Sequence, residues 1–215
     1  CQNNLPANFN VISSIDLSNN LLIEKVFCQG IQLSSLDVSN NLSLTDLNCA
    51  SNLLNSLNIS NNSALKWLQC NANSLDSLDL GVKPFFRYLK ADNNSLESID
   101  ASTCPNLKYF YLNNNNLNSL NFQNGNNTIV QQFKTYNNFN LSCIQVDDTV
   151  YSTSNWWNID PWTAFSTNCS LAGCMDPLAC NYNPLAEIDD GTCYYPENNY
   201  DCEGNCISDI DCFGE

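Results

Sequence analysis

The chain has 215 residues, a formal net charge of −15 and no histidine. This length and composition fit a folded extracellular protein of one or two domains better than a disordered chain. Only seven residues are basic, so phosphate groups would be repelled and nonspecific nucleic-acid binding is disfavoured. No apolar run reaches the roughly 18 residues that a transmembrane helix needs, so no transmembrane segment is expected.

The N-terminal segment, residues 1–20, is polar and carries only a few apolar anchors. We expect it to cap the first unit of the fold that follows, because an open end would expose apolar side chains and unpaired strand groups. The chain begins at Cys1 rather than Met. A removed signal sequence and a lipid-anchored N-terminal cysteine are two explanations, and a free or disulfide-paired Cys1 stays open.

Two apolar positions recur every 21 residues between Ile15 and Cys143. The first set is Val26, Leu47, Leu68, Leu89, Phe110 and, after 23 residues, Phe133. The second set is Ile15, Leu36, Leu57, Leu78, Ile99, Leu120 and, again after 23, Cys143. One two-residue insertion in the segment 123–130 explains both slips. A period of this size predicts a solenoid, in which each repeat is one coil stacked on its neighbours.

Each coil is predicted to begin with a short strand. Apolar residues two apart, such as Leu47 and Cys49, would both turn their side chains inward. Five residues after the first of each pair an asparagine recurs, whose amide can donate and accept at once and so satisfy backbone groups where the chain bends. These residues are Asn52, Asn73, Asn94, Asn115 and Asn138.

This pattern resembles the leucine-rich repeat family, in particular the short-repeat, internalin-like secreted and surface proteins of bacteria. The resemblance implies a β-rich solenoid over residues 21–142, with parallel strands on one face and little helix, in a secreted or cell-surface protein. In the second half of the coils, Asn41 and Asn62 have no counterpart in later repeats, so irregular turns are expected there. The departures from the family pattern are at Ile31, Lys83, Cys104 and Gly125.

The cysteines form two populations. Cys28, Cys49 and Cys70 lie 21 residues apart at an inward position. Stacked coils are about 4.8 Å apart, but three residues in one column cannot all pair and their side chains run parallel, so we expect free buried thiols. Eight cysteines crowd the last third of the chain, which is typical of a disulfide-stapled secreted module. Cys1 and Cys104 have no obvious partner.

Residues 143–172 are predicted to cap the other end of the stack, with Cys143 bonded to Cys169. The periodic pattern stops here, and an aromatic group follows, which we expect to lie over the last coil. A carbohydrate-binding role for the tryptophans is the alternative. The group consists of Trp156, Trp157, Trp162 and Phe165.

Residues 173–215 show no strand or helix period and are predicted to form a small acidic module held by cross-links. The segment resembles the GCxDPxAxNYNPxAxxDDGxC repeat near the C-termini of secreted marine bacterial proteins and, more distantly, thrombospondin type 3 calcium loops. Calcium is the cofactor that hard oxygen ligands at such spacing would suit, although Asx turns use the same residue types. The candidate ligands are Asp176, Asn181, Asn183, Glu187, Asp189 and Asp190. The pairing of Cys174, Cys180, Cys193, Cys202, Cys206 and Cys212 stays open.

Catalysis is not expected. Without histidine the usual general base is absent, and the sequence has no arrangement typical of a nucleophilic serine or cysteine. Adjacent carboxylates such as Asp147 and Asp148 do not fit the separated pair that glycoside hydrolysis needs.

The residues that flank the inward positions of each first strand must point to solvent, because strand side chains alternate. An outward aromatic column is therefore expected at Trp67, Tyr88 and Tyr109, bordered by Tyr111 and Tyr136. Six of the seven basic residues lie on or beside this face. They are Lys25, Lys66, Arg87, Lys90, Lys108 and Lys134.

A purely structural interpretation treats these aromatic and basic residues as repeat fillers that pack on one another. The functional interpretation is a binding face for an extracellular partner protein, because aromatic residues and arginine dominate protein hot spots. Two alternatives are an acidic polysaccharide, carboxylated or sulfated, bound by the same face, and a structural role in which the module is a calcium-stiffened spacer. Salt should weaken polysaccharide binding steeply.

Overall fold

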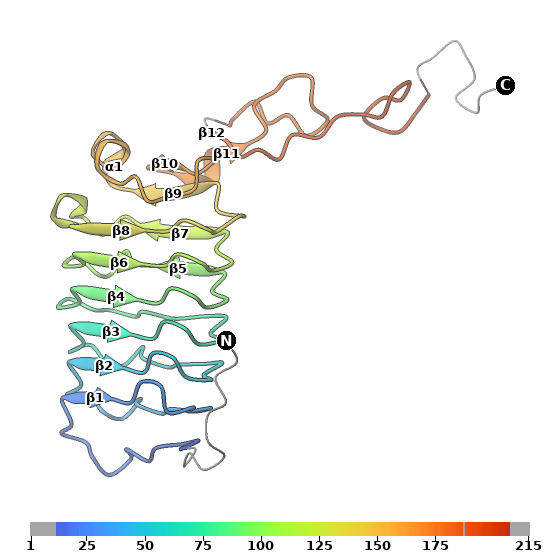
Figure 1. Cartoon of the computed structure of the whole chain (residues 1–215). Coiled ribbons are helices and arrows are strands. Elements are labelled where there is room, and N and C mark those ends of the chain that lie inside the picture. The colour runs from blue at the N-terminus through green and yellow to red at the C-terminus, as the bar shows by residue number, and fades with distance from the viewer. Residues whose placement is uncertain (1–11, 187, 207–215) are drawn as a thin grey trace, which may run out of the picture.

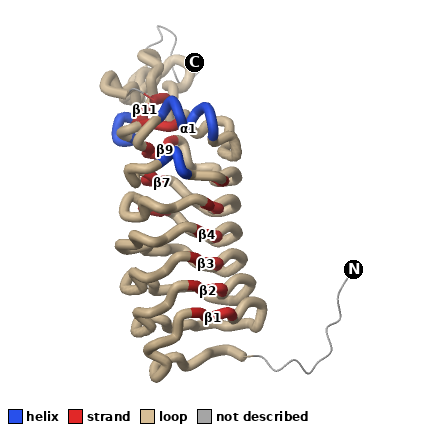
Figure 2. Tube along the Cα trace, turned by 90° about the vertical axis from the view of Figure 1, so that its left-hand side faces the viewer, coloured by secondary structure: helices blue, strands red, loops and turns tan. Residues whose placement is uncertain are grey.

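A computed structural model describes residues 12–186 and 188–206. The predicted solenoid is confirmed: short coils stack into an elongated column, with parallel strands on one side (Figure 1). Most of each coil is turn and loop, as Figure 2 shows. Of the predicted cap over residues 1–20, residues 12–20 are described, and Ile15 and Leu17 pack on the core. Residues 1–11 and 207–215, with Cys1 and Cys212, lie outside the described part of the chain, as does Glu187.

The first halves of the coils form one parallel sheet, with the strand order β1-β2-β3-β4-β6-β8. In each strand the central residue is buried and its two neighbours are at least partly exposed, as the alternation predicts. The partners are 21 residues apart, as Leu47 and Leu68 are, until the insertion makes the step 23 between Phe110 and Phe133. The strands are β1 (Lys25–Phe27), β2 (Asp46–Asn48), β3 (Trp67–Gln69), β4 (Tyr88–Lys90), β6 (Tyr109–Tyr111) and β8 (Gln132–Lys134).

The second halves of the later coils form a second parallel sheet, β10-β9-β7-β5, at the opposite side of the column. In the earlier coils the same positions, such as Leu36 and Leu57, are buried without forming a strand. The core therefore lies between the two sides and is lined by both apolar sets of the repeat. The strands are β5 (Ser98–Asp100), β7 (Ser119–Phe122), β9 (Cys143–Val146) and β10 (Ala164–Ser166).

A ladder of buried and half-buried asparagines joins neighbouring coils. The Nδ2 of Asn73 donates to the carbonyl oxygens of Cys49 and Cys70, both at 3.0 Å, while its Oδ1 accepts from the backbone N–H of Leu54 at 3.0 Å. Each amide thus satisfies groups in two coils, which confirms the predicted role. The other members of the ladder are Asn52, Asn94, Asn115 and Asn138.

An irregular turn was expected at Lys83. Instead, Lys83 makes the hydrogen bond that an asparagine makes in the preceding coil. Asn62 Nδ2 donates to the carbonyl of Val38 at 2.9 Å, and one coil later Lys83 Nζ donates to the equivalent carbonyl of Ile59 at 2.7 Å. The Lys83 side chain is fully buried, and burial lowers its pKa. A lysine therefore takes the place of an asparagine in the column, and the turn keeps the repeat geometry.

After the insertion, Asn127 starts the short 3₁₀ helix η1 (Asn127–Ile129), 23 residues after Cys104. Its Nδ2 donates to the carbonyl of Phe122 at 3.0 Å, and its Oδ1 accepts from the N–H of Asp147 at 2.8 Å. Asn62 instead donates to the carbonyls of Val38 and Asn41 in the preceding coil, so Asn127 does not repeat its contacts.

Residues 143–172 add a further coil rather than a plain lid. Ala164 in β10 pairs with Cys143, 21 residues earlier, and helix α1 (Thr149–Asn155) lies above the first-half side (Figures 1 and 2). Trp156 stacks on Phe133, with ring centroids 4.2 Å apart, and Phe165 contacts Trp156 at 5.7 Å. These two aromatics cover the last coil as predicted.

Two other aromatics of this segment do not cover the core. Trp157 is 77% exposed, and Trp162 is 45% exposed and stacks on the exposed Phe139 with centroids 6.0 Å apart. The expectation that all four aromatics lie over the last coil is therefore wrong for these two. The predicted disulfide between Cys143 and Cys169, the first residue of η2 (Cys169–Leu171), is present.

The thiols in the stack are reduced, as expected. Cys28, Cys49, Cys70 and Cys104 are buried and free. Because burial disfavours the thiolate, it raises the pKa of Cys49 to about 12 and that of Cys104 to about 11. These thiols act as small apolar core groups.

The module beyond residue 172 is held by cross-links. Disulfides join Cys174 to Cys193 and Cys180 to Cys202, and Cys206 is also disulfide-bonded. The regular secondary structure of the module, within the described residues, is the parallel pairing of β11 (Ala172–Gly173) with β12 (Ile188–Asp189). No helix in the described part of the chain is long and apolar enough to span a membrane.

Candidate recognition face

The strand face consists of the outward side chains of β1, β2, β3, β4, β6 and β8. The register places Trp67 beside Tyr88 and Tyr88 beside Tyr109, so residues 21 apart in sequence are neighbours in space. Trp67 and Tyr88 stack with centroids 5.3 Å apart and planes at 26°, and Tyr109 follows at 5.8 Å. The predicted aromatic column therefore exists.

Two more aromatic residues widen this column. Tyr111 lies 5.7 Å from Tyr88, and the exposed Phe27 contacts Trp67 edge-on at 6.2 Å, across the coil that carries only Asp46 and Asn48. Phe27 was not part of the predicted aromatic column, although its position two residues after Lys25 indicates the same face. We call Phe27, Trp67, Tyr88, Tyr109 and Tyr111 the aromatic strip.

The rings of the strip cover one another. Because Trp67 and Tyr88 are nearly parallel at stacking distance, each occupies a face of the other. Polar contacts hold the pattern: Gln69 Nε2 donates to the Tyr88 hydroxyl at 3.4 Å, and the Tyr109 hydroxyl donates to Gln131 Oε1. The strip therefore presents ring edges and hydroxyl groups to solvent more than open ring faces.

The basic column, Lys66, Arg87 and Lys108, runs along the entry of the strands. The N–H of Arg87 donates to the carbonyl of Lys66 at 2.9 Å, and that of Lys108 to the carbonyl of Arg87 at 3.0 Å, so these residues are stacked. Among the described residues, the one ion pair joins Lys25 to Asp46, at 3.6 Å. The cations of the basic column thus have no carboxylate partner in the described part of the chain.

The remaining predicted site residues border the strip. Lys134 Nζ lies 5.5 Å from the ring centre of Tyr111, a cation–π contact, while Lys90 is the register partner of Tyr111. Tyr136 is 37% exposed. Burial and the neighbouring Tyr88 and Tyr109 raise the pKa of Tyr111. The seventh basic residue, Lys83, is the one in the core, so every cation that can face a ligand lies on or beside the strand face.

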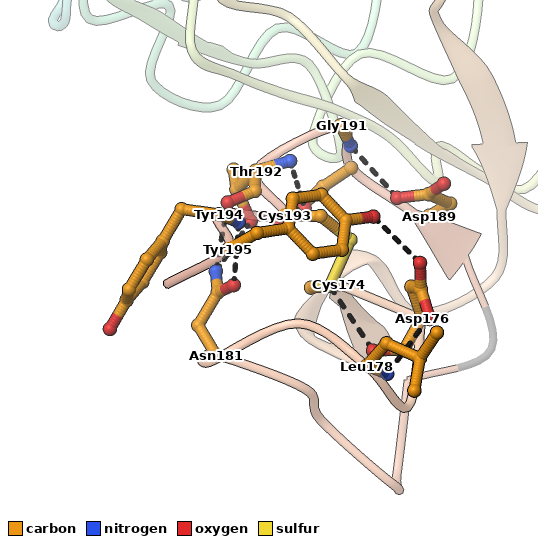
Figure 3. The surroundings of a disulfide bond; sticks show 11 residues. Cys174, Asp176, Leu178, Asn181, Asp189, Gly191, Thr192, Cys193, Tyr194 and Tyr195 are labelled. Carbon is orange, nitrogen blue, oxygen red and sulfur yellow. Dashed lines mark hydrogen bonds between the residues drawn. A yellow bond between two sulfur atoms is a disulfide. The ribbon is translucent and has the colours of Figure 1, made fainter. Parts of the chain in front are cut away.

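The five predicted calcium ligands that the structure describes are engaged in turns, and Figure 3 shows Asp176, Asn181 and Asp189 among them. Asp176 accepts from the Tyr195 hydroxyl at 2.6 Å and from the N–H of Leu178 at 2.9 Å, and the Tyr195 contact lowers the pKa of Asp176 and raises that of Tyr195. Asp189 and Asp190 accept from the N–H groups of Gly191 and Thr192.

The two asparagines are also engaged. Asn181 bridges to the backbone of Thr192 and Tyr194, and Asn183 Oδ1 accepts from the N–H of Leu185. No group of three acidic, histidine or cysteine side chains suited to a metal gathers among the described residues, to which Glu187 does not belong. Calcium would have to compete with these turns, and its binding stays a prediction.

Comparisons with known proteins add one structural likeness. No family model matches the chain, and no curated protein matches it. Among solved structures, the functional domain of InlJ from Listeria monocytogenes, described as including a cysteine ladder, is similar with a TM-score of 0.36 and 18% sequence identity. The match covers 70% of this chain and 46% of that chain. The fold assignment therefore stands on the coil register and the sheets described above.

Proposed function

We propose that the protein recognises an extracellular partner protein, with an acidic contact surface, through its strand face and by noncovalent contact. The observation that carries this proposal is the aromatic strip beside the basic column, whose cations have no carboxylate partner among the residues that the structure describes. Aromatic residues and arginine supply most of the binding energy in protein interfaces. The three disulfides with both partners described support an extracellular setting, since such bonds persist in oxidising compartments.

The geometry of the rings favours a protein over a polysaccharide. A sugar ring packs against an open aromatic face. In the strip, Trp67 and Tyr88 cover one face of each other, and Phe27 and Tyr109 lie against the two ends of this pair. Protein side chains can pack between ring edges and accept hydrogen bonds from the tyrosine hydroxyls. The strip is also held in place before binding, which reduces the entropy lost when a partner docks.

The test is a direct binding measurement with matched variants. Proteins captured from extracellular fractions are purified, and each is titrated against the wild type and against the triple variant Trp67→Ala, Tyr88→Ala, Tyr109→Ala. The control triple variant carries Phe139→Ala, Val150→Ala and Trp157→Ala, which removes exposed apolar side chains outside the strand face.

We expect the strand-face variant to lose at least about 30-fold in affinity, corresponding to about 2 kcal/mol, and the control variant to bind like the wild type. Circular dichroism verifies that both variants are folded. Equal binding by the wild type and the strand-face variant would overturn the proposal. A salt-sensitive signal for sulfated or carboxylated glycans, with no protein bound, would favour the polysaccharide instead.

A further inference from the structure

Asn71 and Asp92 lie side by side at the exit of the strand face. Each follows its strand, β3 or β4, by two residues, and the N–H of Ala72 donates to the carbonyl of Asp92 at 3.0 Å, which continues the register of the sheet. Because side chains two apart on a strand point the same way, these two residues share the side of Gln69 and Lys90.

A chain of side-chain amides fixes the Asp92 carboxylate. Asn137 Nδ2 donates to Asn114 Oδ1 at 2.7 Å, Asn114 Nδ2 donates to Asn93 Oδ1 at 3.0 Å, and Asn93 Nδ2 donates to Asp92 Oδ2 at 2.5 Å. All three asparagines hold left-handed backbone conformations, with φ of 59°, 57° and 56°. The donors run in one direction and end on the charged oxygen, which holds Asp92 in one orientation.

The other carboxylate oxygen is unsatisfied. Asp92 is 8% exposed, and its Oδ1 is buried and accepts no hydrogen bond from any described residue. The neighbouring Asn71 Oδ1 is buried and unsatisfied in the same way. Buried acceptors, and charged ones above all, are rarely left without a donor in native proteins. Lys90, on the same face, forms no ion pair with Asp92 within the described residues.

Two unsatisfied acceptor oxygens on neighbouring coils suit a group that carries several N–H donors. An ammonium offers three and a guanidinium five, and both also match the negative charge of Asp92. Calcium takes six to eight oxygen ligands, more than this pair supplies. The pair lies on the strand face that carries the aromatic strip, where cationic side chains gain further contact with ring edges and hydroxyl oxygens.

We propose that Asn71 and Asp92 form a subsite for a lysine or arginine side chain of the partner protein. This inference rests on the proposed function and specifies where the charged side chains of the partner would lie. Arg87 precedes Asp92 by five residues, which is about 16 Å along a strand. The partner would thus present carboxylates to the basic column and one cation to Asp92, with the aromatic strip between them.

The test uses a small probe in place of the partner. N-acetyl-lysine methylamide is titrated into the ¹⁵N-labelled full chain, with the neutral N-acetyl-norleucine methylamide as the matched probe. We expect saturable shifts of the Asn71, Asp92 and Asn93 amide signals with the lysine probe alone. The shifts should vanish in Asp92→Asn and persist in Asp46→Asn, which removes another carboxylate from the same face. Identical titrations for Asp92→Asn and the wild type would overturn the subsite.

A second measurement distinguishes a binding role of Asp92 from a purely structural one. In Asp92→Asn the new amide oxygen still accepts from Asn93, and the buried charge is removed. We therefore expect an unchanged or raised melting temperature together with the lost probe response. A lowered melting temperature with an unfolded spectrum would show that Asp92 serves the fold instead. Because this titration needs no partner, its result is independent of the strand-face binding test, and either proposal can fail alone.

Discussion

The coil stack and the C-terminal module of this chain are stabilised in opposite ways. In the stack, apolar side chains and asparagine amides repeat every coil, and the thiols stay reduced. In the module, disulfides connect turns that are closed by single Asp and Asn side chains. A repeated sequence can bury a continuous core, whereas a short acidic segment cannot and needs covalent links.

The largest expected effect is on the module. Replacing both Cys174 and Cys193 by serine removes a cross-link that closes a loop of 19 residues, worth about 3 kcal/mol. The module has few buried apolar residues to compensate, so it should unfold while the stack remains folded. Hydrogen exchange measured by mass spectrometry separates the two regions. Protection that stays high beyond residue 173 would contradict the contrast drawn above.

In the stack, the asparagine ladder should matter most. Asn115→Ala leaves the N–H of Leu96 without a partner and removes one of the two asparagine donors from the carbonyls of Ala91 and Leu112, at a cost of about 2 kcal/mol. The neighbouring Asn116 is exposed, and Asn116→Ala should change stability by less than about 0.5 kcal/mol. Urea unfolding curves provide the comparison. Similar losses of unfolding free energy for both variants would mean that the buried Asn115 amide does not stabilise the contact between coils.

The free thiols should make the stack sensitive to alkali. An unfolded thiol ionises near its ordinary pKa of 9.0, whereas Cys49 in the fold keeps its proton to about 12. The folded state therefore binds more protons in this window, so stability is full below pH 9 and falls as the pH rises. At pH 10 the loss from Cys49 is about 1.4 kcal/mol.

Cys49→Ala isolates that contribution. The difference in unfolding free energy between pH 7 and pH 10 should shrink by this amount relative to the wild type. Lys83 acts in the opposite direction, because its lowered pKa means that the unfolded state binds more protons just below pH 10.5. An unchanged pH difference in Cys49→Ala would show that the thiol column is not shielded from water.

The smallest effect concerns calcium in the module. If the oxygens of Asp189 and Asp190 bind the ion, calcium at five times its Kd should stabilise the module by about 1 kcal/mol. The stack should not respond. Differential scanning calorimetry and titration calorimetry with Ca²⁺, with Mg²⁺ as the matched ion, give the measurement. No heat and no thermal shift would end the calcium prediction and leave the turns as purely structural.

The coil stack could be predicted from the sequence because its apolar residues recur with a fixed period. The position of Leu68 follows from Leu47 and Leu89 with no knowledge of the turns, and the outward place of Tyr88 follows with it. The two-residue insertion was found because it displaced both apolar sets together. The free state of Cys49 followed from the geometry of equivalent positions in one column.

Single departures from the repeat could not be predicted from its period. Nothing in the pattern indicates that the Lys83 ammonium can reach the carbonyl that an asparagine serves elsewhere, because this depends on side-chain length inside one turn. The extra coil at β10 was missed for a related reason: Ala164 and Phe165 keep the spacing but not the leucine pattern. The unsatisfied oxygen of Asp92 is a property of packing and hydrogen bonding, which a column of polar residues does not reveal.

The recognition face depends on rings that are 21 residues apart in sequence being neighbours in space. Two-dimensional nuclear Overhauser spectra of the full chain test this most directly. Cross-peaks between the Trp67 indole and the Tyr88 ring, and between the Tyr88 and Tyr109 rings, are the predicted result, at centroid separations of 5.3 and 5.8 Å. Assigned spectra in which neither ring pair gives a cross-peak would contradict the aromatic strip and with it the proposed face.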